Sequence, residues 1–269
     1  MVNSSAPRTY PWWNMSDSGK MSSRSAQASN ERPFYADHAD AYDLLITDPV
    51  EPWVDAVHEK LAGRSTILDA GCGTGRHAAA LIARGHHVDL ADAAEHLLAI
   101  ARLRCPSARA YLADLCTLRT PATYDAVTCR GVLNDLVTDE ERDAAIHTLA
   151  ALSSRLLLLD VREQTASRVR VTGVTRARTV TLSPAHSLTY TTRTTWEAGL
   201  LRVHEQYELT GASPRVYDFT MRPWTTDELT GRLREAGLVD IEIRPGVGRK
   251  TPDRLFVIAS QGGPATAPS

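Results

Sequence analysis

The sequence has few cysteines and no long apolar run, and both absences limit the class of protein. The four cysteines stand alone, without a CxxC pair or a Cys/His set at zinc-ligand spacing, so we expect reduced thiols and no metal site. No segment approaches the roughly 18 apolar residues of a membrane-spanning helix, and residues 1–31 lack the apolar centre of a secretory signal. These features predict a cytoplasmic protein with no membrane partner.

An excess of basic residues is also missing. The 30 lysines and arginines are matched by 32 acidic residues, which gives a formal net charge of −2. Proteins that hold nucleic acid neutralise its phosphates with a basic stripe, so this balance argues against a nucleic-acid partner. We expect a small-molecule partner instead, and the sequence leaves open whether the chain forms a homo-oligomer.

The two ends of the chain differ in composition from its centre. Residues 1–31 are rich in Ser, Asn and Pro and predict a disordered tail, and 262–269 form a second, short tail. Met1, Met15 and Met21 are all candidate starts. The chain as a whole is 43% hydrophobic, which is enough for the core of an ordinary globular domain.

Between the tails, predicted strands alternate with predicted helices. Apolar and β-branched runs predict strands at 66–70, 87–91, 108–112, 124–129, 156–159, 239–243 and 255–259. Helices are expected at 35–61, interrupted at Pro49 and Pro52, at 76–84 and 94–104, and after the capping sequences 138–141 and 225–228. This order predicts an α/β fold with a Rossmann-like, doubly wound, seven-stranded sheet that is mostly parallel.

The pattern changes after the fifth of these strands. Residues 169–209 are rich in Thr and Val and alternate with period two, as in 170–172, and they lack helical periodicity. We expect three or four antiparallel strands there. A β insertion at 167–210 would then interrupt a Rossmann-like domain made of 32–166 and 211–261, and would cover the acceptor pocket.

A glycine-rich loop and two acidic residues follow the first three strands. The glycines of the loop 71–75 let a ligand approach the main chain at the start of a helix. Asp92 and Asp114 end the next two strands, where one can bind ribose hydroxyls and the other an adenine amino group. Each aspartate alone would equally fit a turn or cap. Arg76 stands where a nicotinamide fingerprint has glycine or alanine, which disfavours a dinucleotide.

These residues resemble the class I S-adenosylmethionine-dependent methyltransferases. The run 68–75 is similar to the first motif of that family, and Asp92, Asp114-Leu115 and 124–127 match its next three positions in order and spacing. The resemblance covers about 35–162 and the last strands. The chain departs from the family at Ser153-Ser154-Arg155, where a Pro-Gly-Gly turn is common.

The resemblance implies S-adenosylmethionine (SAM) as the cofactor. The first two loop glycines would pass its methionine moiety, Asp92 would hold the ribose, and Asp114 with Leu115 the adenine. Asp69 would orient the loop or contact the amino group through water, and Arg130 begins a loop that borders cofactor and acceptor in this family. The implied cofactor-binding residues are Asp69, Gly71, Gly73, Asp92, Asp114, Leu115 and Arg130.

The expected reaction is methyl transfer to a small molecule, with an amine nitrogen as the favoured acceptor. The loop after the fourth strand lacks the motifs of enzymes that methylate nucleic-acid bases. Tyr35 and Tyr42 lie in a segment that looks like the N-terminal lid of small-molecule N-methyltransferases, where aromatic faces would cover the sulfonium; packing against the core is the alternative. His204 and Glu205 would accept a proton, or lie on a solvent-facing strand.

Other functions stay open from the sequence alone. An enzyme with the same cofactor can break a different carbon–sulfur bond and release methylthioadenosine. A protein that binds SAM without turnover is a second alternative, and a nicotinamide-dependent dehydrogenase a third. The sequence names neither the acceptor nor the atom that is methylated.

Overall fold

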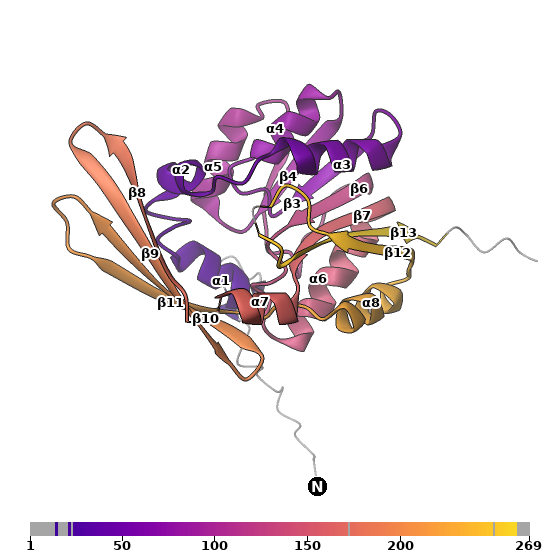
Figure 1. The fold of residues 1–269 in the computed structure, drawn as a ribbon. Coiled ribbons are helices and arrows are strands. Elements are labelled where there is room, and N and C mark those ends of the chain that lie inside the picture. The colour runs from indigo at the N-terminus through magenta and orange to yellow at the C-terminus, as the bar shows by residue number, and fades with distance from the viewer. Residues whose placement is uncertain (1–13, 16–20, 23, 172, 250, 263–269) are drawn as a thin grey trace, which may run out of the picture.

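The computed structural model describes residues 14–15, 21–22, 24–171, 173–249 and 251–262. Its largest sheet has seven strands (Figure 1), which are, in sheet order, β12 (Leu238–Pro245), β13 (Arg254–Gln261), β7 (Ser153–Arg162), β6 (Tyr124–Arg130), β3 (Thr66–Ala70), β4 (His87–Asp92) and β5 (Ala110–Leu112). β13 is antiparallel to both of its neighbours, and the other pairs are parallel. The predicted Rossmann-like, mostly parallel sheet is confirmed.

Helices cover both faces of this sheet. One face carries α3 (Glu51–Leu61), α4 (Arg76–Ala83) and α5 (Glu95–Arg104), and the other carries α6 (Asp139–Leu152) and α8 (Thr226–Glu235). Side chains alternate along a strand, so neighbours such as Ile67 and Leu68 on β3 belong to different apolar clusters, one on each face. This arrangement of helix, sheet and helix layers fixes the carboxyl ends of the parallel strands along one edge of the sheet.

The predicted helix starts are also confirmed. The Thr138 and Thr225 side chains accept hydrogen bonds from the backbone N–H groups of Glu141 and Glu228, each at 3.1 Å, which satisfies donors that lack a partner within the helix. The expected interruption near Pro49 lies between α2 (Tyr42–Leu45) and α3, and Pro52 occupies the first turn of α3. Proline is tolerated there because that N–H has no intrahelical acceptor.

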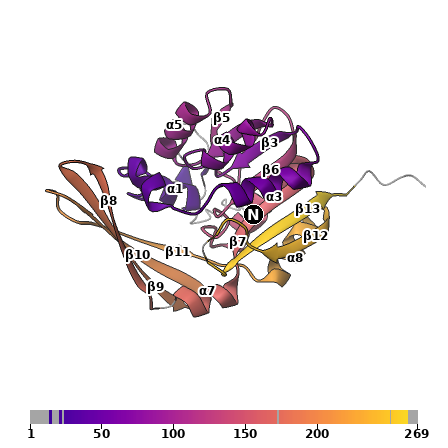
Figure 2. The ribbon, with the colours of Figure 1, turned by 45° about the horizontal axis from the view of Figure 1, so that its top comes forward.

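The insertion is a separate four-stranded antiparallel sheet, and its limits differ from the expected ones. It contains β8 (Thr175–Ser183), β9 (His186–Glu197), β10 (Leu200–Leu209) and β11 (Arg215–Met221), in the order β11-β10-β9-β8. The expected end at residue 210 is wrong, because β11 continues the sheet by pairing with β10. We call these strands the insertion sheet; it stands at one end of the larger sheet, beside α1 (Figure 2).

The strand expected at 170–172 is wrong as well. Arg170 and Val171 belong to a helix, α7 (Gln164–Val171), and residue 172 lies outside the described residues. The Glu163 carboxylate accepts hydrogen bonds from the N–H groups of Thr165 and Ala166 and so caps this helix. Three alternating residues are too short a pattern to outweigh such a cap.

The N-terminal segment is more ordered than its composition predicts. The disorder expected for 1–31 is wrong over α1 (Arg24–Glu31), which is followed by the short helix η1 (Ala39–Ala41). Ala26 of α1 is buried, and the Asn30 side chain accepts a hydrogen bond from the N–H of Glu95 at 3.4 Å. Tertiary contacts of this kind stabilise a helix that is weak in isolation.

The other predictions about the ends of the chain lie largely outside the described residues. Asn14–Met15 (β1) and Met21–Ser22 (β2) pair as a two-stranded antiparallel ribbon. The rest of the expected N-terminal tail before residue 24 lies outside the described residues, as do 263–269 of the C-terminal tail.

The four cysteines are free and buried. In the described part of the chain, no helix is long and apolar enough to cross a membrane.

Candidate active site

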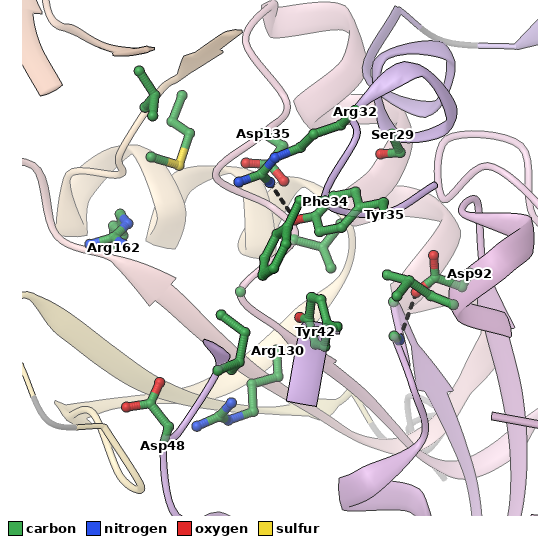
Figure 3. A pocket seen from close by; sticks show the side chains of 18 of the residues that line it. Ser29, Arg32, Phe34, Tyr35, Tyr42, Asp48, Asp92, Arg130, Asp135 and Arg162 are labelled. Atoms are coloured by element: carbon green, nitrogen blue, oxygen red, sulfur yellow. Dashed lines mark hydrogen bonds between the residues drawn. The ribbon is translucent and has the colours of Figure 1, made fainter. Parts of the chain in front are cut away.

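A cavity of about 390 Å³ lies at the carboxyl ends of the parallel strands. Its walls come from the loops after β3, β4 and β6, from residues 29–48 of the N-terminal segment, and from the insertion sheet. Figure 3 shows Asp92 on one side of the aromatic residues Phe34, Tyr35 and Tyr42, and Arg162 on the other side. We call Asp69, Gly71, Gly73, Asp92 and Leu115 the cofactor side of the cavity.

The glycine loop brings main chain against the cavity wall. Gly71 and Gly73 adopt φ angles of +78° and +55°, which disfavour residues with a Cβ atom. A Cβ on Gly71 would lie 2.3 Å from Cγ2 of Val132, so the loop after β6 packs directly on it. A Cβ on Gly73 would lie 3.8 Å from the Tyr42 hydroxyl, which places the N-terminal segment next to this loop.

Asp92 holds the glycine loop and keeps capacity for a ligand. One of its oxygens accepts a hydrogen bond from the N–H of Gly73 at 2.7 Å, and the other accepts one from the N–H of Ala94 at 2.8 Å. Burial raises the pKa of this carboxyl, and these hydrogen bonds oppose the rise. A carboxylate has about four acceptor positions, so each oxygen can accept a further bond, as ribose hydroxyls require.

Asp69 is buried at the end of β3. It accepts a hydrogen bond from the Thr128 hydroxyl of β6 at 2.9 Å, and burial raises its pKa to about 6. Two neighbouring strands therefore fix its position below the glycine loop. This location fits the orienting role that the resemblance implies.

Asp114 and Leu115, the two residues expected at the adenine, are placed differently from each other. Leu115 is buried and lines the cavity, but Asp114 is not among the lining residues. The Asp114 side chain accepts a hydrogen bond from the N–H of Cys116 at 2.9 Å. Leu115 therefore forms the apolar wall expected beside an adenine, and a contact from Asp114 to the adenine stays a prediction.

An aromatic cluster covers the middle of the cavity. The Tyr42 ring lies 5.0 Å from that of Phe34 and 6.0 Å from that of Tyr35, measured between ring centroids. Burial raises the pKa of both tyrosines, so the hydroxyls stay neutral. The structure therefore brings Tyr35 and Tyr42 together at the cavity, as polarizable faces that suit a sulfonium cation.

Known proteins share this fold and this sequence pattern. A family model described as "Methyltransferase domain" matches residues 67–155. A ubiquinone biosynthesis O-methyltransferase of Paraburkholderia phytofirmans is 36% identical over 87 residues, which are 30% of this chain and 37% of that protein. The chain thus matches little more than a third of the length of this curated relative.

Two solved structures are similar over most of their length. SAM-bound CalS10, an amino pentose methyltransferase from Micromonospora echinaspora, is 23% identical with a TM-score of 0.64, over 85% of this chain and 92% of that one. The sugar N-methyltransferase KedS8 from Streptoalloteichus is 18% identical with a TM-score of 0.73, over 83% and 92%. Residues 67–155 therefore belong to a methyltransferase domain of the class I, SAM-dependent kind. SAM is the cofactor of this class, and the cofactor side of the cavity fits it.

Arg130, at the end of β6 in this methyltransferase domain, lines the same cavity as the cofactor side. It donates a hydrogen bond to the Gly248 carbonyl at 2.8 Å, and its guanidinium lies 5.8 Å from the Trp53 ring. Burial and the nearby Arg249 lower its pKa to about 10, so it stays a cation. Cofactor binding by Arg130 stays a prediction, supported by its place in the cavity wall.

His204 and Glu205 point to opposite faces of β10. The His204 side chain is about half exposed (48%) and pairs with Asp218 at 2.8 Å, away from the methyltransferase cavity. Glu205 is fully buried and accepts hydrogen bonds from Arg32, Tyr190 and Tyr207. Glu205 therefore joins the N-terminal segment to the insertion sheet. His204 does not line this cavity, but it lines a neighbouring one whose walls also include Arg32, Tyr35 and Asp135.

Asp135 is, with Asp48, an acidic residue of the cavity wall to which the sequence analysis gave no role. It lines the cavity beside Arg32 (Figure 3). Burial raises its pKa to about 6, although Arg32 and Arg162 act in the opposite direction. The only sequence signal was its position in the loop after β6, four residues beyond Gly131.

Proposed function

We propose that this chain transfers the methyl group of SAM to an amine nitrogen of a small molecule. The observation that carries the proposal is that one cavity contains both the cofactor side and a second, partly buried carboxyl, Asp135, with a raised pKa. A volume of about 390 Å³ suits a small molecule. The insertion sheet and the N-terminal segment form its roof, which leaves little room for a polymer.

The cofactor side supplies positioning. When bound, SAM supplies an electrophilic methyl carbon on its sulfonium. Asp92 and the glycine loop would hold its ribose and methionine parts, Leu115 its adenine, and Tyr42 would lie beside the loop. Holding the two reactants in alignment supplies much of the rate enhancement of such a bimolecular reaction, without any covalent role for the protein.

Asp135 gives a reason to favour an amine. An amine at neutral pH carries an extra proton, which must leave before the nitrogen lone pair can attack. A carboxylate next to the acceptor attracts the ammonium and accepts that proton. Desolvation raises the pKa of Asp135 to about 6, which is closer to the range in which general bases work. The names of the two similar structures, a sugar N-methyltransferase and an amino pentose methyltransferase, agree with this choice.

An oxygen acceptor is the second candidate, because the curated relative is named an O-methyltransferase.

The proposed setting is the cytoplasm, since all four cysteines are free thiols. We also propose that the methyltransferase domain consists of 32 to about 163 and 222–262, with α7 and the insertion sheet between these parts.

The proposal is tested by identifying the products. The purified protein is incubated with SAM and a panel of matched small amines and phenols, and products are identified by mass spectrometry. We expect S-adenosylhomocysteine and an N-methylated amine. Methylthioadenosine would instead indicate cleavage of another carbon–sulfur bond, SAM binding without turnover would indicate a binding protein, and saturation by NAD without affinity for SAM would refute the proposal.

A further inference from the structure

One wall of the cavity is built from arginines. Five of them come from separate elements, namely Arg162 at the end of β7, Arg170 on α7, Arg176 on β8, Arg249 in the loop after β12, and Arg254 at the start of β13. We call them the arginine side. Four of them form ion pairs, and their partners are Asp48, Asp160 and Asp253. Five cations thus meet three carboxylates, and Arg130 adds a sixth cation nearby.

Two of the aspartates explain why four of these arginines are fixed. Asp160 is fully buried and accepts hydrogen bonds from Arg249 at 2.6 and 3.0 Å and from Arg254 at 3.0 Å. Asp253 is fully buried too and accepts hydrogen bonds from Arg170, at 3.0 Å, and from Arg162. These pairs compensate the charge of the buried carboxylates, but some guanidinium N–H groups remain without an acceptor among the described residues.

The remaining donors lie around Asp253. The side chain of Arg176, an exposed residue of β8 that lines the cavity, makes no hydrogen bond or ion pair within the described part of the chain. The buried Nε of Arg162 has no acceptor there either. Desolvation lowers the pKa of Arg176, repulsion from the nearby Arg170 lowers it further, and Asp253 acts in the opposite direction. A negative group from outside the protein would satisfy these donors and relieve the repulsion.

We propose that the acceptor carries an anionic group, a carboxylate or a phosphoryl group, and that Arg162, Arg170 and Arg176 bind it. The proposal rests on the proposed function, because it assigns a substrate class to the same cavity. Guanidinium groups present paired N–H donors that match both kinds of anion. An anion held there lies near Asp135, whose charge interacts with Arg162, so one molecule with an anionic end and an amine would satisfy both sites.

The test measures anion binding with the cofactor product already in place. The protein is saturated with S-adenosylhomocysteine, and pyrophosphate or succinate is titrated by calorimetry. We expect one of the two anions to bind the wild type and to bind Arg176→Gln at least about tenfold more weakly, since a hydrogen bond to a charged group is lost. Arg176→Lys should keep part of the affinity. Tighter binding of pyrophosphate identifies a phosphoryl group, and tighter binding of succinate a carboxylate.

Arg155→Gln is the matched control, because it removes one exposed arginine at the opposite end of β7. It should bind the anion as the wild type does. The proposal is overturned if neither anion binds the saturated wild type, if Arg176→Gln binds as well as Arg155→Gln, or if anions bind only when S-adenosylhomocysteine is absent. Failure to bind S-adenosylhomocysteine at all would contradict the proposed function itself, which separates the two failures.

Discussion

The two sides of the cavity are built by different means. On the cofactor side, main chain and short side chains from residues 69–115 form the wall, and tight loops after consecutive strands bring them together. On the arginine side, long charged side chains meet from β7, α7, β8 and β13. The first arrangement is encoded locally, whereas the second depends on how distant elements pack. Each prediction below probes that difference.

The largest effect should come from the contact that joins the insertion sheet to the N-terminal segment. Arg32→Ala leaves the fully buried Glu205 without its cation, so we expect the free energy of unfolding to fall by about 3–5 kcal/mol. Urea denaturation measures this loss. Arg215→Ala is the control: Arg215 also pairs across these segments, with Asp37, but both side chains are about half exposed (56% and 49%). Its loss should stay within about 1 kcal/mol, and equal losses would contradict the assignment.

The next effect tests the main-chain wall. Gly71→Ala introduces a Cβ that meets Val132 at a φ of +78°, and we expect the affinity for S-adenosylhomocysteine to fall by about 3 kcal/mol, roughly 100-fold. Calorimetry measures it. Gly85→Ala has a similar φ of +90° with no atom within 4 Å of the new Cβ, so it should bind normally. Adding Val132→Ala to Gly71→Ala should recover part of the affinity if the clash is the cause.

The features that can be predicted from the sequence also differ between locally encoded parts of the molecule and parts that depend on distant contacts. The glycine loop, Asp92 and the mostly parallel seven-stranded sheet are predictable, because each depends on a motif of a few residues or on a repeated strand–helix pattern. The Arg32–Glu205 pair joins residues 173 positions apart, and no local signal indicates it. The period-two pattern of β10 shows that His204 and Glu205 face opposite ways. Only the packing of one face of the insertion sheet against the N-terminal segment decides which side is inward.

Asp92→Ala probes the second part of the cofactor side. It removes the hydrogen bonds that hold Gly73 and those expected to the ribose, so we expect cofactor affinity to fall by about 1–3 kcal/mol. Asp92→Asn keeps one side-chain oxygen acceptor and should lose less. Calorimetry with S-adenosylhomocysteine orders the three proteins. Unchanged affinity in Asp92→Ala would remove this residue from the cofactor site.

Asp135→Asn tests proton transfer beside the arginine side. The carboxylate is the form that accepts a proton, so wild-type kcat/KM should rise as the pH increases through about 6, the raised pKa of Asp135. The amide does not titrate, so the variant should lose this rise and be slower by about tenfold or more at neutral pH. S-adenosylhomocysteine affinity, measured in parallel, should not change. A variant that keeps the same pH profile would exclude Asp135 as the proton acceptor.

The smallest effect is expected at His204, and it tests the comparison from outside the cavity. Its side chain pairs with Asp218 on the outer face of the insertion sheet, where an exposed pair contributes about 0–1 kcal/mol. His204→Ala should therefore leave kcat/KM within about twofold of the wild type, whereas Glu205→Gln, one residue further along, weakens a buried contact with Arg32 and should destabilise the protein measurably. A large loss of activity in His204→Ala, with stability retained, would mean that catalysis uses the outer face of the insertion sheet. The cavity would then be only the cofactor half of the site.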